Sequence, residues 1–148
     1  MKTFLVAVIT ITIGLGATFI VQDNAVTVVQ AKDIKWIAAK GMPEGMMTSP
    51  VHGDPAKGPS LSMNKLPAGA TVRPHIHSSD EVATVVSGAI WLGSGETMDE
   101  TKATLIEAGG YVHIRAKAPH WAKAKTECVF LRYTNGPADI TYLDEKKK

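Results

Sequence analysis

Two histidines and a glutamate lie close together in residues 69–88, a segment that begins and ends with glycine. His75 and His77 are two residues apart, so that on a strand both rings would project from the same face. Glu81 would begin the next strand, where a hairpin would bring its carboxylate beside the two rings. A third imidazole could come from His120, which follows a second glycine-rich turn. Imidazoles and a carboxylate are the ligands of many Fe, Mn, Ni, Cu and Zn sites, and these residues are therefore candidate metal ligands.

Strands rather than helices are expected to position these side chains. Short β-branched runs alternate with turns rich in Gly, Pro, Asn and Asp, which is typical of an all-β sandwich or barrel. Residues 41–58 are rich in glycine and proline and are expected to form a loop-like arm over the core. Strands are expected at residues 60–66, 70–75, 81–87, 89–93, 103–106, 111–114, 120–125, 128–134 and 139–143, with one helical turn at 98–102.

The composition restricts the class of protein. A chain of 148 residues, 45% of them hydrophobic and 20% charged, suits a single globular domain. The formal net charge of +2 is too small to indicate binding to nucleic acid or to a membrane surface by charge alone. The single cysteine, Cys128, excludes an intrachain disulfide framework, and its apolar surroundings in the sequence predict a buried thiol.

The start of the chain has the layout of a secretory signal. Lys2 precedes an uncharged apolar run at residues 3–21, and Val29 and Ala31 favour cleavage after position 31. An uncleaved membrane anchor is the competing interpretation, since about 20 apolar residues can span a bilayer. We expect an exported protein, periplasmic or extracellular, with a signal peptide at 1–31, an N-terminal arm at 32–59, a barrel at 60–143 and a basic tail at 144–148. Membrane contact would occur only through an uncleaved N-terminal segment.

The spacing of the candidate ligands resembles a known motif. Gly69, His75, His77, Glu81 and Gly88 match all the specified positions of the first motif of the cupin superfamily. The second cupin motif runs Gly, five residues, Pro, one, Gly, two, His, three, Asn. Gly109 and His120 match it, whereas Arg115, Lys117 and Ala124 replace its Pro, second Gly and Asn. The second motif therefore keeps its ligand and loses its turn residues.

The resemblance covers residues 60–143 and implies a single-domain double-stranded β-helix, the cupin jelly-roll barrel. The segments GDPAKGP, LPAG and GPADITYLD look like those of small bacterial cupins of unassigned activity. By resemblance, His75, His77, Glu81 and His120 would bind one divalent transition metal ion, whether Fe, Mn, Ni, Cu or Zn. The resemblance also makes a homodimer a reasonable expectation.

The resemblance leaves the reaction open, because cupins include oxygenases, isomerases, sensors and storage proteins. One hypothesis is an exported metal-dependent enzyme, of the oxygenase or isomerase type, that acts on a small oxygenated organic molecule with Glu81 as catalytic proton acceptor. The alternative is a binding or sensing module that uses the same pocket without turnover. A third hypothesis is a self-assembling structural barrel in which the metal serves at most to stabilise the structure.

Several other side chains have two interpretations each. His113 would line the pocket or form a hydrogen bond outside it, and His52 is expected to be solvated in its turn. Trp91 and Trp121 would wall the pocket or pack in the core. The methionines of the arm could bind Cu(I) as soft ligands or serve only in packing; they are Met42, Met46 and Met47.

Overall fold

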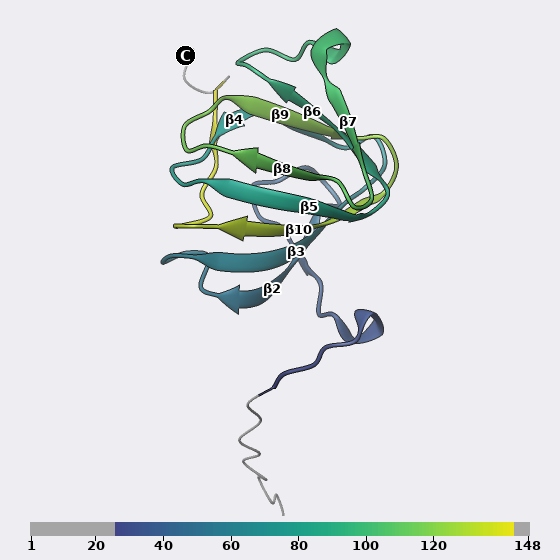
Figure 1. Cartoon of the computed structure of the whole chain (residues 1–148), viewed down its shortest axis with the longest axis vertical. Coiled ribbons are helices and arrows are strands. Elements are labelled where there is room, and N and C mark those ends of the chain that lie inside the picture. The colour runs from purple at the N-terminus through teal and green to yellow at the C-terminus, as the bar shows by residue number, and fades with distance from the viewer. Residues whose placement is uncertain (1–25, 144–148) are drawn as a thin grey trace, which may run out of the picture.

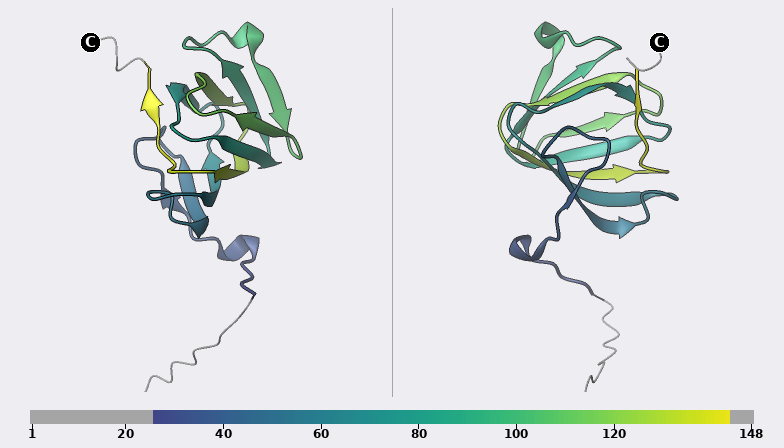
Figure 2. Two further views of the ribbon diagram at one scale, coloured as in Figure 1. Left: turned by 60° about the vertical axis from the view of Figure 1, so that its left-hand side comes forward. Right: turned by 180° about the vertical axis from the view of Figure 1, so that it is seen from behind.

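The computed structural model describes residues 26–143, which form two antiparallel β-sheets packed face to face (Figures 1 and 2). The all-β prediction is confirmed. The predicted signal peptide, apart from residues 26–31, and the basic tail at 144–148 lie outside the described residues. Within residues 26–143, no helix is long and apolar enough to cross a membrane.

The larger sheet has six strands in the order β1-β2-β3-β10-β5-β8, and the smaller has five in the order β11-β4-β9-β6-β7. The larger sheet consists of β1 Ile37–Ala38, β2 Met47–Gly53, β3 Ser60–Leu66, β10 Cys128–Thr134, β5 Glu81–Ser87 and β8 Tyr111–Ile114. The smaller consists of β11 Thr141–Tyr142, β4 Thr71–Ile76, β9 His120–Ala124, β6 Ala89–Ser94 and β7 Thr104–Glu107. Two short 3₁₀ helices, η1 Ala31–Asp33 and η2 Glu100–Lys102, complete the elements.

The strands follow the sequence pattern closely. β3, β5, β8 and β10 have the bounds expected from the sequence, and the other predicted strands differ by one or two residues at an end. Helix η2 occupies the expected helical turn. Alternation of side chains explains this agreement, since every second residue of β3 is buried between the sheets.

One expectation about residues 41–58 was wrong, because this segment is not entirely loop. Its middle part, Met47–Gly53, forms β2, which pairs with β3 in antiparallel register. Pro50 lacks an N–H group for the ladder, and the register shifts between Pro50 and His52. The irregularity lets a sequence rich in turn residues still add a strand to the larger sheet.

The core lies between the sheets and is closed at one end by a tight connection. Leu66 and Cys128 are fully buried, and each large buried apolar side chain contributes about 1.5–3 kcal/mol relative to exposure. Cys128 is buried, which confirms the prediction of a buried thiol, and burial raises the pKa of this thiol to about 11. Gly88 has φ +78° and passes so close to Glu127 that a Cβ atom would lie 2.0 Å from its carbonyl oxygen. A side chain at this motif glycine is therefore excluded.

Lys117 adopts the conformation that the second cupin motif assigns to glycine. Its φ is +63°, the one positive φ among the non-glycine residues that the structure describes. The side chain is exposed, and the backbone N–H donates a 2.8 Å hydrogen bond to the carbonyl of His77. The turn therefore keeps its shape and its contact with a candidate ligand, at a cost of about 1–2 kcal/mol for a left-handed L-residue.

We predict that Lys117→Gly stabilises the protein by about 1 kcal/mol, because glycine removes the left-handed strain but is more flexible in the unfolded chain. A rise of a few degrees in the melting temperature, measured by circular dichroism, is expected. Lys117→Ala is the matched control and should bring no gain, since alanine has the same steric conflict. An unchanged or lower melting temperature for Lys117→Gly would contradict this account.

Candidate metal centre

Three buried histidines converge at one end of the sandwich. His75 on β4 and His120 at the start of β9 are directly paired in register, and His77 follows the last residue of β4. One ring nitrogen from each lies within 4.8 Å of the other two. The ring centroids of His75 and His120 are 4.1 Å apart. The structure thus brings together the three histidines on which the sequence prediction depends.

Each of the three rings is oriented by a backbone carbonyl. Nδ1 of His75 donates to the carbonyl of Arg73 at 2.6 Å, and Nδ1 of His120 donates to that of Ala118 at 2.9 Å. Nδ1 of His77 donates to the carbonyl of Asp139. A carbonyl oxygen only accepts hydrogen bonds, so Nδ1 carries a proton in every ring, and in a neutral ring Nε2 then keeps its lone pair. This is the arrangement in which proteins present histidine to a metal ion.

The segment at the C-terminal end of the chain holds His77 in place. The carbonyl of Asp139 accepts the hydrogen bond from His77 Nδ1, and its side-chain Oδ1 accepts a 2.9 Å hydrogen bond from the backbone N–H of Ser78. Strand β11 then pairs with β4, with Thr141 opposite Ile76 and Tyr142 opposite His75. The final strand therefore fixes the backbone on both sides of the candidate ligands.

Glu81 reaches the histidines from the opposite sheet. The sequence analysis expected a hairpin between the strands of His77 and Glu81, and this was wrong, because β4 and β5 belong to different sheets. The chain crosses between the sheets in the loop, and Glu81 Oε2 comes to 3.3 Å from His77 Nε2. The group of ligand atoms that all lie within 4.8 Å of one another consists of the three histidines, and Glu81 lies beside this group.

The residues fit a divalent metal ion. Glu81 Oε2 is buried and makes no hydrogen bond, and it faces Nε2 of His77, the nitrogen that offers a lone pair when the ring is neutral. Two such lone pairs repel each other unless a proton or a metal cation lies between them. Ligands at about 2.0–2.2 Å from one ion are separated from each other by about 3.0–3.5 Å, which matches the 3.3 Å found here.

Arg132 is a residue of this site that the sequence analysis missed. It lies on β10 opposite Ala83 of β5, and its Nη1 is 3.6 Å from Glu81 Oε2. Its side chain is only 18% exposed. The available signal was a single arginine within the apolar run 128–134. Whether its side chain points into the core depends on which face of the strand is internal.

A cavity of about 70 Å³ lies between the sheets, with the polar side chains of this site in its wall. By the usual measure, one water needs about 10–15 Å³, so the cavity has room for roughly five to seven water-sized groups. Its remaining lining is almost wholly apolar and includes Leu66, Val72, Val85, Ile90, Ile114 and Phe130. The site therefore suits a small ligand with an apolar part.

Burial keeps two of the histidines uncharged. Burial and the neighbouring His120 lower the pKa of His75 to about 3, and burial also lowers the pKa of His120. Both shifts favour neutral imidazole, which is the form that binds metal.

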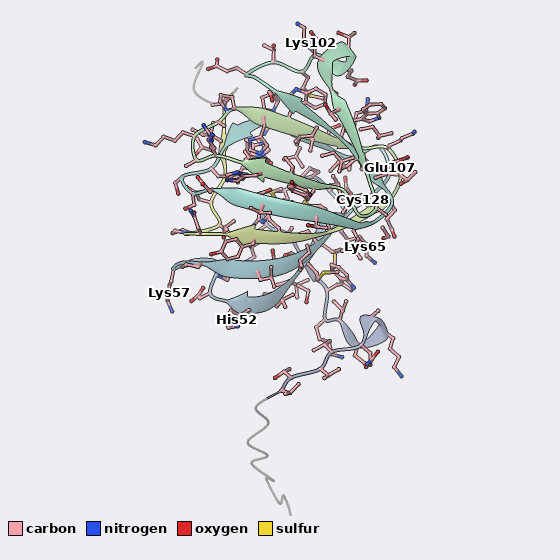
Figure 3. The ribbon with its side chains drawn as sticks, in the orientation of Figure 1. His52, Lys57, Lys65, Lys102, Glu107 and Cys128 are labelled. Carbon is pink, nitrogen blue, oxygen red and sulfur yellow. The ribbon has the colours of Figure 1, made fainter. Side chains whose placement is uncertain are left out.

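The remaining candidates lie outside this cluster. His113 is on the exterior of β8, with Nε2 3.3 Å from Asp80 Oδ2, which confirms the interpretation of a hydrogen bond outside the pocket. His52 is exposed at the outer rim of the larger sheet, as expected (Figure 3). Trp121 is fully buried against Gly93 and, like Trp91, does not line the cavity. Met42 and Met46 do line it, whereas Met47 lies on β2.

Comparison with known proteins supports the same fold. The family model described as "Domain of unknown function (DUF4437)" matches residues 20–140. None of the curated proteins matches the sequence. Many solved structures are similar to this chain, and the three described next share 14–19% identity with it, which shows the fold alone.

The first of these structures is an acetylacetone dioxygenase from Acinetobacter johnsonii, with 19% identity, a TM-score of 0.65, and 86% of this chain and 84% of that chain covered. The polyketide cyclase RemF from Streptomyces resistomycificus has 14% identity and a TM-score of 0.64, with 80% and 85% covered. An RmlC-like cupin from Shewanella frigidimarina has 15% identity and a TM-score of 0.59, with 74% and 89% covered.

We predict that the metal-free protein loses stability on acidification. Above pH 6.5 His75 is neutral in both states, and between pH 6.5 and about 3 only the unfolded chain takes up the proton. The unfolded state is therefore favoured as the pH falls through this window. Melting temperatures of chelator-treated protein, measured from about pH 7 to about pH 4, should fall by several degrees.

His75→Gln should flatten this pH dependence, leaving the part due to His120. His52→Gln, on the exposed rim of β2, is the matched control and should keep the wild-type slope. Equal slopes for wild type and His75→Gln would show that His75 does not titrate in this way.

Proposed function

Because the chain belongs to the DUF4437 family of cupin-type domains, we propose that it is a metal-dependent enzyme, of the oxygenase or isomerase type, that acts on a small oxygenated organic molecule. The observation that carries this proposal is the set of three buried histidines, each held at Nδ1 by a backbone carbonyl. The fold alone selects no reaction, so the argument depends on the site.

The side chains of the site have separate parts in such a reaction. His75, His77, His120 and Glu81 would hold the metal. A bound divalent ion supplies Lewis acidity or redox chemistry toward a substrate oxygen. The low pKa of His75 means that a proton does not compete for its ring at neutral pH. The apolar walls of the cavity exclude water and strengthen the electrostatic contacts within it.

Glu81 is the side chain best placed to accept a proton. Its Oε2 is buried in the cavity wall, makes no hydrogen bond and is within reach of a ligand beside the histidines. Arg132 Nη1 lies 3.6 Å from the same oxygen and forms an ion pair with it. In the proposed reaction Glu81 Oε2 takes up a proton from the bound molecule and returns it.

Similar folds accommodate chemistry of this class. The acetylacetone dioxygenase and the polyketide cyclase named above are enzymes whose names refer to oxygenated organic compounds. At 19% and 14% identity they support the choice of substrate class for this chain only by analogy.

A non-catalytic binding or sensing function is the second candidate. Among the described residues that line the cavity, Glu81 and Arg132 are the ionisable side chains other than the three histidines. Glu81, itself one of the proposed metal ligands, is then the single carboxylate of this lining that could transfer a proton. The absence of a second acid–base group from this lining favours binding without turnover.

We predict that wild-type protein contains about one metal ion per chain and that His75→Ala loses metal and turnover together, because one of three ring ligands is removed. Elemental analysis gives the metal content. Incubation in air with a panel of short-chain carboxylic acids, hydroxy acids and diketones, followed by mass spectrometry, gives turnover.

His113→Ala is the matched control, since it removes an exposed histidine outside the cavity, and it should keep both metal and turnover. Turnover that survives in metal-free His75→Ala would contradict the metal-dependent mechanism. A compound that raises the melting temperature of the metal-loaded protein but is recovered unchanged would favour the binding function.

We also propose that the protein is exported, on the basis of the uncharged run at residues 3–21 and the Val29 and Ala31 positions. We predict that the protein isolated from its source begins at Lys32 and is recovered outside the cytoplasm. Intact-mass measurement of the periplasmic and secreted fractions checks both points. A chain that retains residues 1–31 in the membrane fraction would instead support the anchor, and one in the cytoplasm would refute export.

A further inference from the structure

Arg132 brings a permanent positive charge into an apolar cavity. It lies on β10 in the middle of the larger sheet, between β3 and β5, opposite Ser62 on one side and Ala83 on the other. Its side chain is 18% exposed and forms part of the cavity wall that includes the three histidines. Burial of a guanidinium is costly unless an anion or a set of acceptors compensates it.

Glu81 compensates Arg132 only in part. The contact between Nη1 and Oε2 is 3.6 Å, which is an ion pair rather than a good hydrogen bond. Arg132 Nε is buried and has no hydrogen-bond partner among the described residues. A guanidinium has five N–H donors in a planar fork, and so this one retains donors for a second anion.

The net positive charge of the metal-loaded site also favours binding of a second anion. Glu81 and Arg132 cancel each other, and the three histidines are neutral when Nε2 binds a metal ion. A divalent ion held there would leave the cavity with about two uncompensated positive charges, surrounded by apolar side chains. An anionic ligand relieves this excess, whereas a neutral ligand does not.

The shape of the cavity limits the rest of the ligand. A volume of about 70 Å³ accommodates a ligand of about five to seven non-hydrogen atoms. Val85 and Phe130 lie on the same two strands as Glu81 and Arg132 and offer contacts to hydrocarbon rather than to polar groups. The ligand therefore combines one anionic group with a short apolar body.

We infer that the site selects short-chain monocarboxylates and that Arg132 is the residue that recognises the carboxylate, with the metal ion as its second contact. This inference rests on the proposed metal-binding function and names its ligand class. Arg132 is a specificity residue, because its charge distinguishes a carboxylate from an amide of the same shape.

The test uses the full chain loaded with Zn²⁺, which has no redox chemistry and leaves the probe unchanged. Zinc uptake is first measured by titration, and butyrate and butyramide are then titrated calorimetrically into the loaded protein. Wild type should bind butyrate at least about tenfold more tightly than butyramide. Arg132→Met should lose about tenfold or more in butyrate affinity and leave butyramide within about twofold, because a similar volume is kept and only the charge is removed.

Two further variants make the result specific. Arg132→Lys retains the charge without the fork and should bind butyrate with intermediate affinity, which also covers the case in which Arg132→Met fails to fold. Arg115→Met removes an exposed arginine outside the cavity and should behave as wild type. If wild type takes up zinc but binds butyrate and butyramide with equal affinity, this inference is overturned and the proposed function is not. Unchanged butyrate binding in Arg132→Met would have the same meaning. Failure of wild type to take up zinc would overturn the proposed function.

Discussion

Three backbone carbonyl oxygens determine what the histidines can do. Because the carbonyls of Arg73, Ala118 and Asp139 accept from Nδ1, the rings cannot turn away or exchange tautomers without loss of a buried hydrogen bond. Two of these carbonyls come from residues only two positions earlier in the chain, so the local backbone itself orients those rings. The metal-binding form of the site is therefore a property of the backbone, and it is present before any ligand arrives.

The two sheets contribute opposite kinds of chemistry. The smaller sheet supplies the neutral imidazoles of β4 and β9, and the larger supplies the charged pair of β5 and β10, Glu81 and Arg132. Packing between the sheets thus sets the distance between ligands and charges, and the apolar residues around them raise the strength of each electrostatic contact. A change in the core that shifted one sheet on the other would alter both metal binding and charge balance.

Much of this arrangement could be predicted from the sequence, and the rest depended on tertiary pairing. The spacing of His75, His77 and His120 identified the cluster, and alternation within the strands gave most of their bounds. The strand β2 was missed because its glycines and prolines indicate turns, whereas pairing with β3 overrides that local preference. Arg132 was missed, and Glu81 was placed in a hairpin, because neither strand faces nor sheet membership can be read from residue types alone.

The contact between His77 and the carbonyl of Asp139 joins residues 62 positions apart in the chain. During synthesis, His75, His77 and Glu81 leave the ribosome long before the segment that orients His77. The nascent chain therefore carries His75 and His77 before the contact that orients His77 can form. The ring of His77 is fixed only after residue 139 has been made, so the complete histidine cluster is a late product of synthesis.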